Sequence, residues 1–127
     1  MSAIHQEIVF DAAPARVYEA YVDAAKHSAF TGAKAEFDAA VGGSFSCHEG
    51  QIVGRTIELV PNERIVQAWR VAGWDPGVYT LVKIELSAEG DGTKLSLDHT
   101  GIPDGMQEHL DGGWHARYWA PLQEYLR

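Results

Sequence analysis

The sequence has one cysteine and no long hydrophobic run, and each of these absences excludes a class of protein. Cys47 has no partner for an intramolecular disulfide, which is consistent with a reducing compartment. No apolar stretch reaches the ~18–20 residues that a membrane-spanning helix requires. The first ten residues, MSAIHQEIVF, lack the basic and apolar regions of a signal peptide. We therefore expect a cytoplasmic protein without membrane insertion.

Positive charge is also scarce. The chain has 10 Lys and Arg residues against 18 Asp and Glu residues, which gives a formal net charge of −8. Nucleic-acid binding draws most of its affinity from basic side chains that neutralise phosphates, and this sequence has no basic run. We expect no nucleic-acid partner. An acidic surface that keeps the protein soluble accounts for the charge.

Motifs for metal binding and nucleophilic catalysis are missing. The six histidines show no H-x-H or H-x-x-x-H spacing, and no C-x-x-C pair is present. Ser44 and Ser46 do not lie in a G-x-S-x-G elbow. The sequence therefore predicts no metal, no cofactor and no residue that can be assigned a catalytic role.

Hydrophobic periodicity predicts an α+β fold in one domain, residues 1–127, a length typical of single domains. A strand at 3–10 is followed by a short helix at 14–22, which begins at Pro14, and by another from Asp23 to about Phe30. Turn signals then separate strands near 34–39, 44–48, 51–60, 64–72, 78–87 and 93–100. Residues 104–127 form a long amphipathic helix whose aromatic stripe needs the sheet as its partner.

Alternation along the strands assigns the two faces of the sheet. The inward set is Phe45, Cys47, Val53, Ile57, Leu59, Ile65, Trp69, Val82, Ile84, Leu95 and Leu97. The outward set is Ser44, Ser46, Glu58, Arg64, Arg70, Lys83, Glu85, Lys94 and Asp98. Three polar residues, Arg55, Gln67 and His99, fall on the inward parity. They are informative because a buried polar group needs a partner.

Three segments carry a family resemblance: GRTIELVPNERIVQAW, GTKLSLDHTGIPDG and GGWHARYWAPLQEYL. Together they resemble the Hsp90-ATPase-activator-homologue-like family of the START-like (SRPBCC, helix-grip) superfamily. The resemblance implies an antiparallel, curved sheet of six to seven strands around a long C-terminal helix, with two short helices after the first strand. Members of the superfamily hold an apolar cavity between sheet and helix. The co-chaperones of the family carry a further N-terminal domain, for which this chain shows no residues, so their activity is not carried over.

We expect the chain to bind a small apolar, aromatic or amphipathic molecule in that cavity. The candidate cavity residues are Arg55, Gln67, Trp69, His99, Trp114 and Tyr118. A binding module is favoured over an enzyme, although a cyclase or hydrolase with His99 as its acid–base group stays open. His99 could equally be a structural histidine with satisfied hydrogen bonds, and Arg55 could extend to water. A chaperone or client interaction domain and a homodimer also stay open.

Overall fold

The computed structural model describes residues 2–38 and 40–127. The strands are β1 (Ser2–Phe10), β2 (Glu36–Phe37), β3 (Ser44–Cys47), β4 (Ile52–Val60), β5 (Arg64–Val71), β6 (Thr80–Glu89) and β7 (Gly92–Ile102). The helices are α1 (Pro14–Val22), α2 (Ala24–Thr31), α3 (Gln107–Trp114), the π-helical segment η1 (His115–Trp119) and α4 (Ala120–Tyr125). The predicted order of elements is confirmed. The strand predicted at 34–39 shortens to β2, and residue 39 lies outside the described residues.

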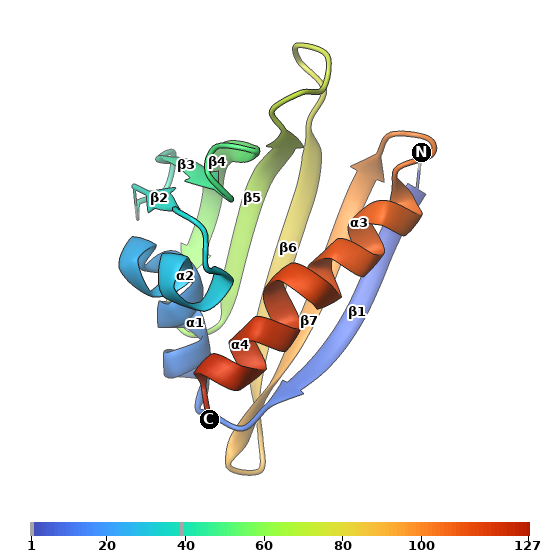
Figure 1. The fold of residues 1–127 in the computed structure, drawn as a ribbon. Coiled ribbons are helices and arrows are strands. Elements are labelled where there is room, and N and C mark those ends of the chain that lie inside the picture. The colour runs from blue at the N-terminus through green and yellow to red at the C-terminus, as the bar shows by residue number, and fades with distance from the viewer. Residues whose placement is uncertain (1, 39) are drawn as a thin grey trace.

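All seven strands form one antiparallel sheet in the order β1-β7-β6-β5-β4-β3-β2. The sheet curves around α3, η1 and α4, which run as one rod along its inner face beside β1 and β7 (Figure 1). The helices α1 and α2 lie toward the β2 end of the sheet, and α2 contacts the C-terminal rod. This is the predicted α+β architecture. Within the described part of the chain, no helix combines the length and apolar character that crossing a membrane requires.

The core lies between the sheet and the C-terminal rod. Trp114, Tyr118, Trp119, Leu122 and Leu126 from the rod are all buried. On the sheet, the predicted inward residues Phe45, Cys47, Ile65, Trp69, Val82, Ile84, Leu95 and Leu97 are buried as well. The assignments on β5, β6 and β7 are correct because these strands pair in an unbroken register, which keeps alternate side chains on one face of the sheet.

Strand β4 departs from simple alternation, and three predicted inward residues are wrong. The pairing with β5 shifts between Thr56 and Glu58, so Ile57 is an extra residue in a β-bulge. Before the bulge the inward residues are Ile52 and Thr56, which are buried. Val53 and Arg55 therefore face outward, and Ile57 is 48% exposed. After the bulge the predicted parity returns, and Leu59 packs against the core.

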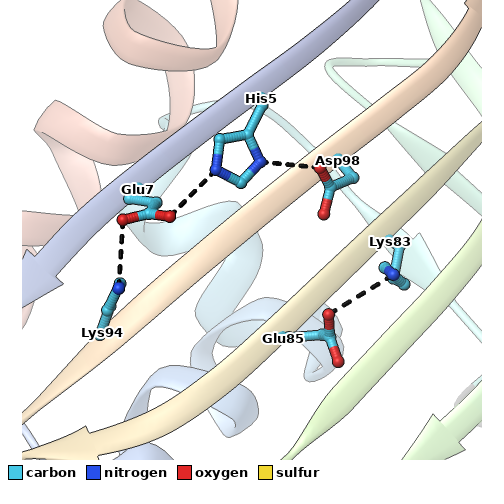
Figure 2. A network of polar contacts seen from close by, with 6 residues as sticks. All are labelled: His5, Glu7, Lys83, Glu85, Lys94 and Asp98. Carbon is cyan, nitrogen blue, oxygen red and sulfur yellow. Dashed lines mark hydrogen bonds and ion pairs between the residues drawn. The ribbon is translucent and has the colours of Figure 1, made fainter.

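The outer face of the sheet is covered by charged side chains that alternate in sign. His5 lies 2.7 Å from Asp98 and 3.0 Å from Glu7, and Glu7 in turn pairs with Lys94 (Figure 2). Lys83 pairs with Glu85 along the neighbouring strand β6. These contacts are exposed, and such surface ion pairs contribute little each. They mark the outer face as solvated and leave the inner face for the core and the site.

Candidate ligand-binding site

The inner face carries an open pocket of about 150 Å³ between the β4–β5 end of the sheet and the C-terminal rod. Its walls are apolar and its rim is polar. The walls are formed by Ile52, Trp69, Val71, Leu110, Trp114 and Tyr118, with Gly113. The rim is formed by His48, Gln51, His109 and Arg117. Small-molecule sites typically combine these two parts, an apolar body and a few placed polar groups.

The aromatic wall is built from strand β5 and the C-terminal rod. Trp69 comes from β5, and Trp114 and Tyr118 come from successive turns of the rod. The rings of Trp114 and Tyr118 have centroids 4.9 Å apart, and those of Trp69 and Trp114 are 6.0 Å apart. Offset contacts at these distances stabilise aromatic clusters beyond their buried area. The three rings form a fixed wall.

The local geometry of the rod at the pocket is unusual. The amide N–H of Ala120 donates to the carbonyl of His115, which is the i to i+5 pattern of a π-helix. Pro121 follows immediately, and a proline ring clashes with the carbonyl four residues earlier, here that of Arg117. The wider π turn relieves this clash. The segment presents Arg117 at the rim and Tyr118 in the wall, and such π segments often occur at functional sites.

Glycines in the rod leave the pocket open. Gly113 lines the pocket, yet a Cβ atom added there would meet no atom within 4 Å. The same holds for Gly112, which is exposed and does not line the pocket. Neither residue has a positive φ. Glycine in a helix costs about 1 kcal/mol relative to alanine, and no neighbouring atom excludes a side chain at position 113. The open pocket beside Gly113 supplies a reason for glycine at this position.

His48 reaches the rim from a strained turn. Its φ is 52°, and Glu49 follows with a φ of 59°, a region that non-glycine residues rarely occupy. The ring lies edge-on to Tyr118 at 5.1 Å and 88°, and its Nε2 atom is buried without a hydrogen-bond partner among the described residues. Burial and the charge of Arg117 lower the pKa of His48. Strain of this kind clusters at functional sites.

The structure brings together three of the six predicted cavity residues, namely Trp69, Trp114 and Tyr118. Arg55 is wrong as a cavity residue: it is exposed on the outer face, where its guanidinium donates to the carbonyl of Gly42 at 3.0 Å. The bulge at Ile57 is the physical reason. The alternative that Arg55 extends to water agrees with this position.

Gln67 and His99 point inward as predicted, but both are buried in the core and hydrogen-bonded there, and neither lines the pocket. Tyr21 donates to Oε1 of Gln67 at 3.1 Å. His99 is bonded through both ring nitrogens, to Trp114 at 3.1 Å and to Thr80 at 2.7 Å. Burial lowers the pKa of His99 to about 4. This arrangement is that of the structural histidine kept as an alternative above.

A second buried histidine and the lone cysteine are also structural in their surroundings. His27 on α2 donates through Nδ1 to the carbonyl of Tyr21 at 2.7 Å, and its Nε2 lies 3.3 Å from the hydroxyl of Tyr118. Burial lowers its pKa to about 4. Burial also raises the pKa of Cys47 to about 12, so the thiol stays protonated. Arg55 faces away and gives the thiol no cation.

The rim residues were missed by reasoning from the sequence. One signal was available, because His109, Gly113 and Arg117 recur at intervals of four and therefore share a helix face. A glycine within such a stripe is a helix-weakening choice that calls for an explanation. His48 had no comparable signal. Among residues 2–38 and 40–127, no three His, Cys, Asp or Glu side chains cluster as a metal site would require; the expected absence of metal stays a prediction.

Comparison with known proteins identifies the family. The chain is 36% identical over 106 residues to the Activator of 90 kDa heat shock protein ATPase homolog of Dictyostelium discoideum, covering 83% of this chain and 28% of that protein. The crystal structure of PFC0360w, an HSP90 activator from Plasmodium falciparum, superposes with a TM-score of 0.93 at 27% identity, over 99% of this chain and 96% of that one. CalU16 from Micromonospora echinospora gives a TM-score of 0.84 at 25% identity, over 98% and 75% of the two chains.

The chain spans only 28% to 38% of the length of the curated relatives it matches. The solved structures with these high TM-scores share its helix-grip fold from end to end. The family model for the Activator of Hsp90 ATPase homolog 1-like protein matches residues 11–127. The chain belongs to this family of Hsp90-ATPase-activator homologues.

Proposed function

We propose that the chain binds a small, mainly apolar molecule in the pocket between β5 and the C-terminal rod. The observation that carries the proposal is Gly113. A helical glycine without a steric or conformational requirement lies directly against an open pocket whose wall is aromatic. The helix loses stability there, and the space that a side chain would fill stays free for a ligand.

The pocket volume limits the size of the enclosed part of such a ligand. An engineered protein cavity of about 150 Å³ lined by apolar side chains binds benzene. The present pocket has a similar volume of about 150 Å³. It is open on one side, so a ligand with one ring can place that ring against Trp69 and Trp114 and extend a substituent to the rim.

The two neighbouring glycines supply a matched test by thermal shift. A leucine at position 113 enters the pocket, whereas a leucine at position 112 enters solvent. In a screen of single-ring aromatic compounds, a ligand should raise the melting temperature of the native chain and of Gly112→Leu equally, because binding to the folded state stabilises it. The shift should be lost in Gly113→Leu. An equal shift in all three proteins would show that the ligand binds elsewhere and would contradict the proposal.

A second candidate function is binding to a chaperone of the 90 kDa heat shock class. The names of the relatives favour this function. PFC0360w, an HSP90 activator, is matched over 96% of its own chain, so an activator of this length exists. The exposed apolar side chains of the outer face include Ile57, Tyr79 and Leu81. A cytoplasmic location, which this role needs, and a homodimer both stay predictions.

The chaperone candidate is tested with the 90 kDa heat shock protein of the same organism. The chain should raise its rate of ATP hydrolysis, and Leu81→Lys should reduce that effect because the charge replaces an apolar contact. Gly113→Leu should leave it unchanged if the outer face is used. An ATPase rate that does not respond to saturating amounts of the chain would remove this candidate.

A further inference from the structure

The charges at the pocket are opposite to those of the chain as a whole. The protein carries a net charge of −8. Among the described residues that line the pocket, the titratable side chains at the rim are Arg117, His48 and His109, and none is a carboxylate. An acidic side chain, Glu49, lies in the adjacent hollow, which His48 and Arg117 also line. The positive charge of Arg117 at the rim favours a ligand that carries negative charge.

Arg117 is free to receive such a ligand. It is exposed on η1, and within residues 2–38 and 40–127 it forms no ion pair and no side-chain hydrogen bond. Two other arginines, by contrast, are engaged: Arg64 pairs with Glu58 at 2.6 Å, and Arg70 donates to the carbonyl of Trp74 at 2.5 Å. A guanidinium matches a carboxylate through two parallel hydrogen bonds. The π turn holds its backbone at the rim, directly before the aromatic wall residue Tyr118.

His48 supplies a second polar group on the opposite side of the rim. It belongs to the β3–β4 turn, so it approaches from the sheet while Arg117 approaches from the rod. Its buried Nε2 has no partner in the described chain. A rotation of this half-buried ring would bring the nitrogen to a ligand at the rim.

We propose that the pocket takes a single-ring aromatic carboxylate, with the ring against Trp69, Trp114 and Tyr118 and the carboxylate held by Arg117 and His48 at the rim. This inference rests on the proposed function, since it assumes that the pocket binds a ligand, and it adds the chemical class of that ligand. A single ring fits the volume of the apolar part of the pocket. A carboxylate is complementary to the positive charge of Arg117 at the rim.

The test compares phenylacetate with phenylacetamide, which has nearly the same shape but no charge. Isothermal titration of the native chain should give an affinity for the acid at least tenfold higher than for the amide, as charge-assisted hydrogen bonds are the stronger ones. In Arg117→Met the preference should disappear, because the apolar stem is retained and the charge is lost. Arg117→Lys should retain part of it. Arg55→Met, the same change at an exposed arginine on the outer face, should match the native chain.

The outcomes separate the two proposals. If the native chain binds the acid and the amide equally, the anion site is wrong and the apolar pocket stands. If Arg55→Met lowers the affinity for the acid as much as Arg117→Met does, the carboxylate is attracted by overall charge and the assignment of Arg117 is overturned. If neither probe binds the native chain at millimolar concentration, both proposals fail.

Discussion

Trp114 donates its indole N–H to Nδ1 of His99 over 3.1 Å, and this contact fixes the protonation of the histidine. Because Nδ1 accepts, the ring proton is on Nε2, which donates to the hydroxyl of Thr80 at 2.7 Å. Thr80 in turn donates to the carbonyl of Trp69 at 2.7 Å. The chain of bonds joins the C-terminal rod to β7, β6 and β5. It holds two walls of the pocket, Trp114 and Trp69, in one network.

Replacing Trp114 with phenylalanine should therefore destabilise the protein by more than the loss of buried side-chain area accounts for. The change leaves Nδ1 of His99 buried without a donor, and an unsatisfied buried group costs about 1–3 kcal/mol in addition to the lost packing. We expect a loss of at least ~2 kcal/mol in the free energy of unfolding, measured with urea at pH 7.5. Trp74→Phe is the control, because Trp74 is only partly buried and donates no hydrogen bond through its indole in the described chain. Equal costs in the two variants would contradict the network.

Acid should destabilise the fold through His27 and His99. The pKa of each is lowered to about 4 by burial, against 6.5 for an ordinary histidine. The unfolded chain thus binds more protons than the folded chain between these values. Stability is complete above pH 6.5 and falls as the pH drops toward 4, by up to roughly 3 kcal/mol per histidine.

Urea unfolding between pH 8 and pH 5 measures this effect before most carboxylates titrate. The free energy of unfolding should be level from pH 8 to 7 and should decline below about pH 6.5. A free energy that stays constant down to pH 5 would show that the two histidines are not held neutral.

Gly54 and Gly112 should respond in opposite ways to alanine. A Cβ on Gly54 would lie 1.9 Å from the carbonyl oxygen of Ala68 and 2.7 Å from the ring of Phe45, so strand β4 must shift. We expect Gly54→Ala to destabilise the protein by about 1–3 kcal/mol or more. Gly112→Ala meets no atom within 4 Å and should stabilise the helix by about 0.5–1 kcal/mol. Melting curves of both variants check the signs, and a neutral Gly54→Ala would refute the close approach.

Arg55→Met should leave the stability and the ligand binding of the protein nearly unchanged. The side chain is exposed and gives up one hydrogen bond, to the carbonyl of Gly42. Surface changes of this kind stay within about 0.5 kcal/mol. The measurement is the melting temperature with and without an aromatic ligand, and both values should match those of the native chain. A selective loss of ligand stabilisation would return Arg55 to the site.

The difference between β4 and its neighbours shows what could be predicted from the sequence. The predicted inward residues on β5, β6 and β7 are buried because these strands pair in an unbroken register; they are Ile65, Trp69, Val82, Ile84, Leu95 and Leu97. Arg55 and Ile57 were misplaced because one extra residue reverses the parity of the strand. Ile57 and Leu59 share one parity in the sequence, so alternation places the whole strand on that parity and carries no local signal of the bulge.

The residues of the candidate site also divide into those that the sequence predicts and those that it does not. Trp69, Trp114 and Tyr118 follow from periodicity, since large aromatic residues on the buried stripe of a helix and a strand must meet. His48 depends on a turn with two successive positive φ values, and Arg117 on a π turn next to Pro121. Both are departures from regular geometry. Periodicity assumes regular elements, so it could not locate His48, and for Arg117 it offered only the spacing of four that this residue shares with Gly113 and His109.

The most direct test of the pocket uses the four tryptophan indole N–H signals in a nitrogen-15 correlation spectrum, recorded during titration with phenylacetate. Trp69 and Trp114 line the pocket, whereas Trp119 does not line it and donates its indole N–H to Oε1 of Gln6 at 2.7 Å. The signals of Trp69 and Trp114 should move in a saturable manner, with that of Trp119 nearly fixed, and Gly113→Leu should abolish the movement. Saturable binding that leaves Trp69 and Trp114 unmoved would contradict the pocket as the ligand site.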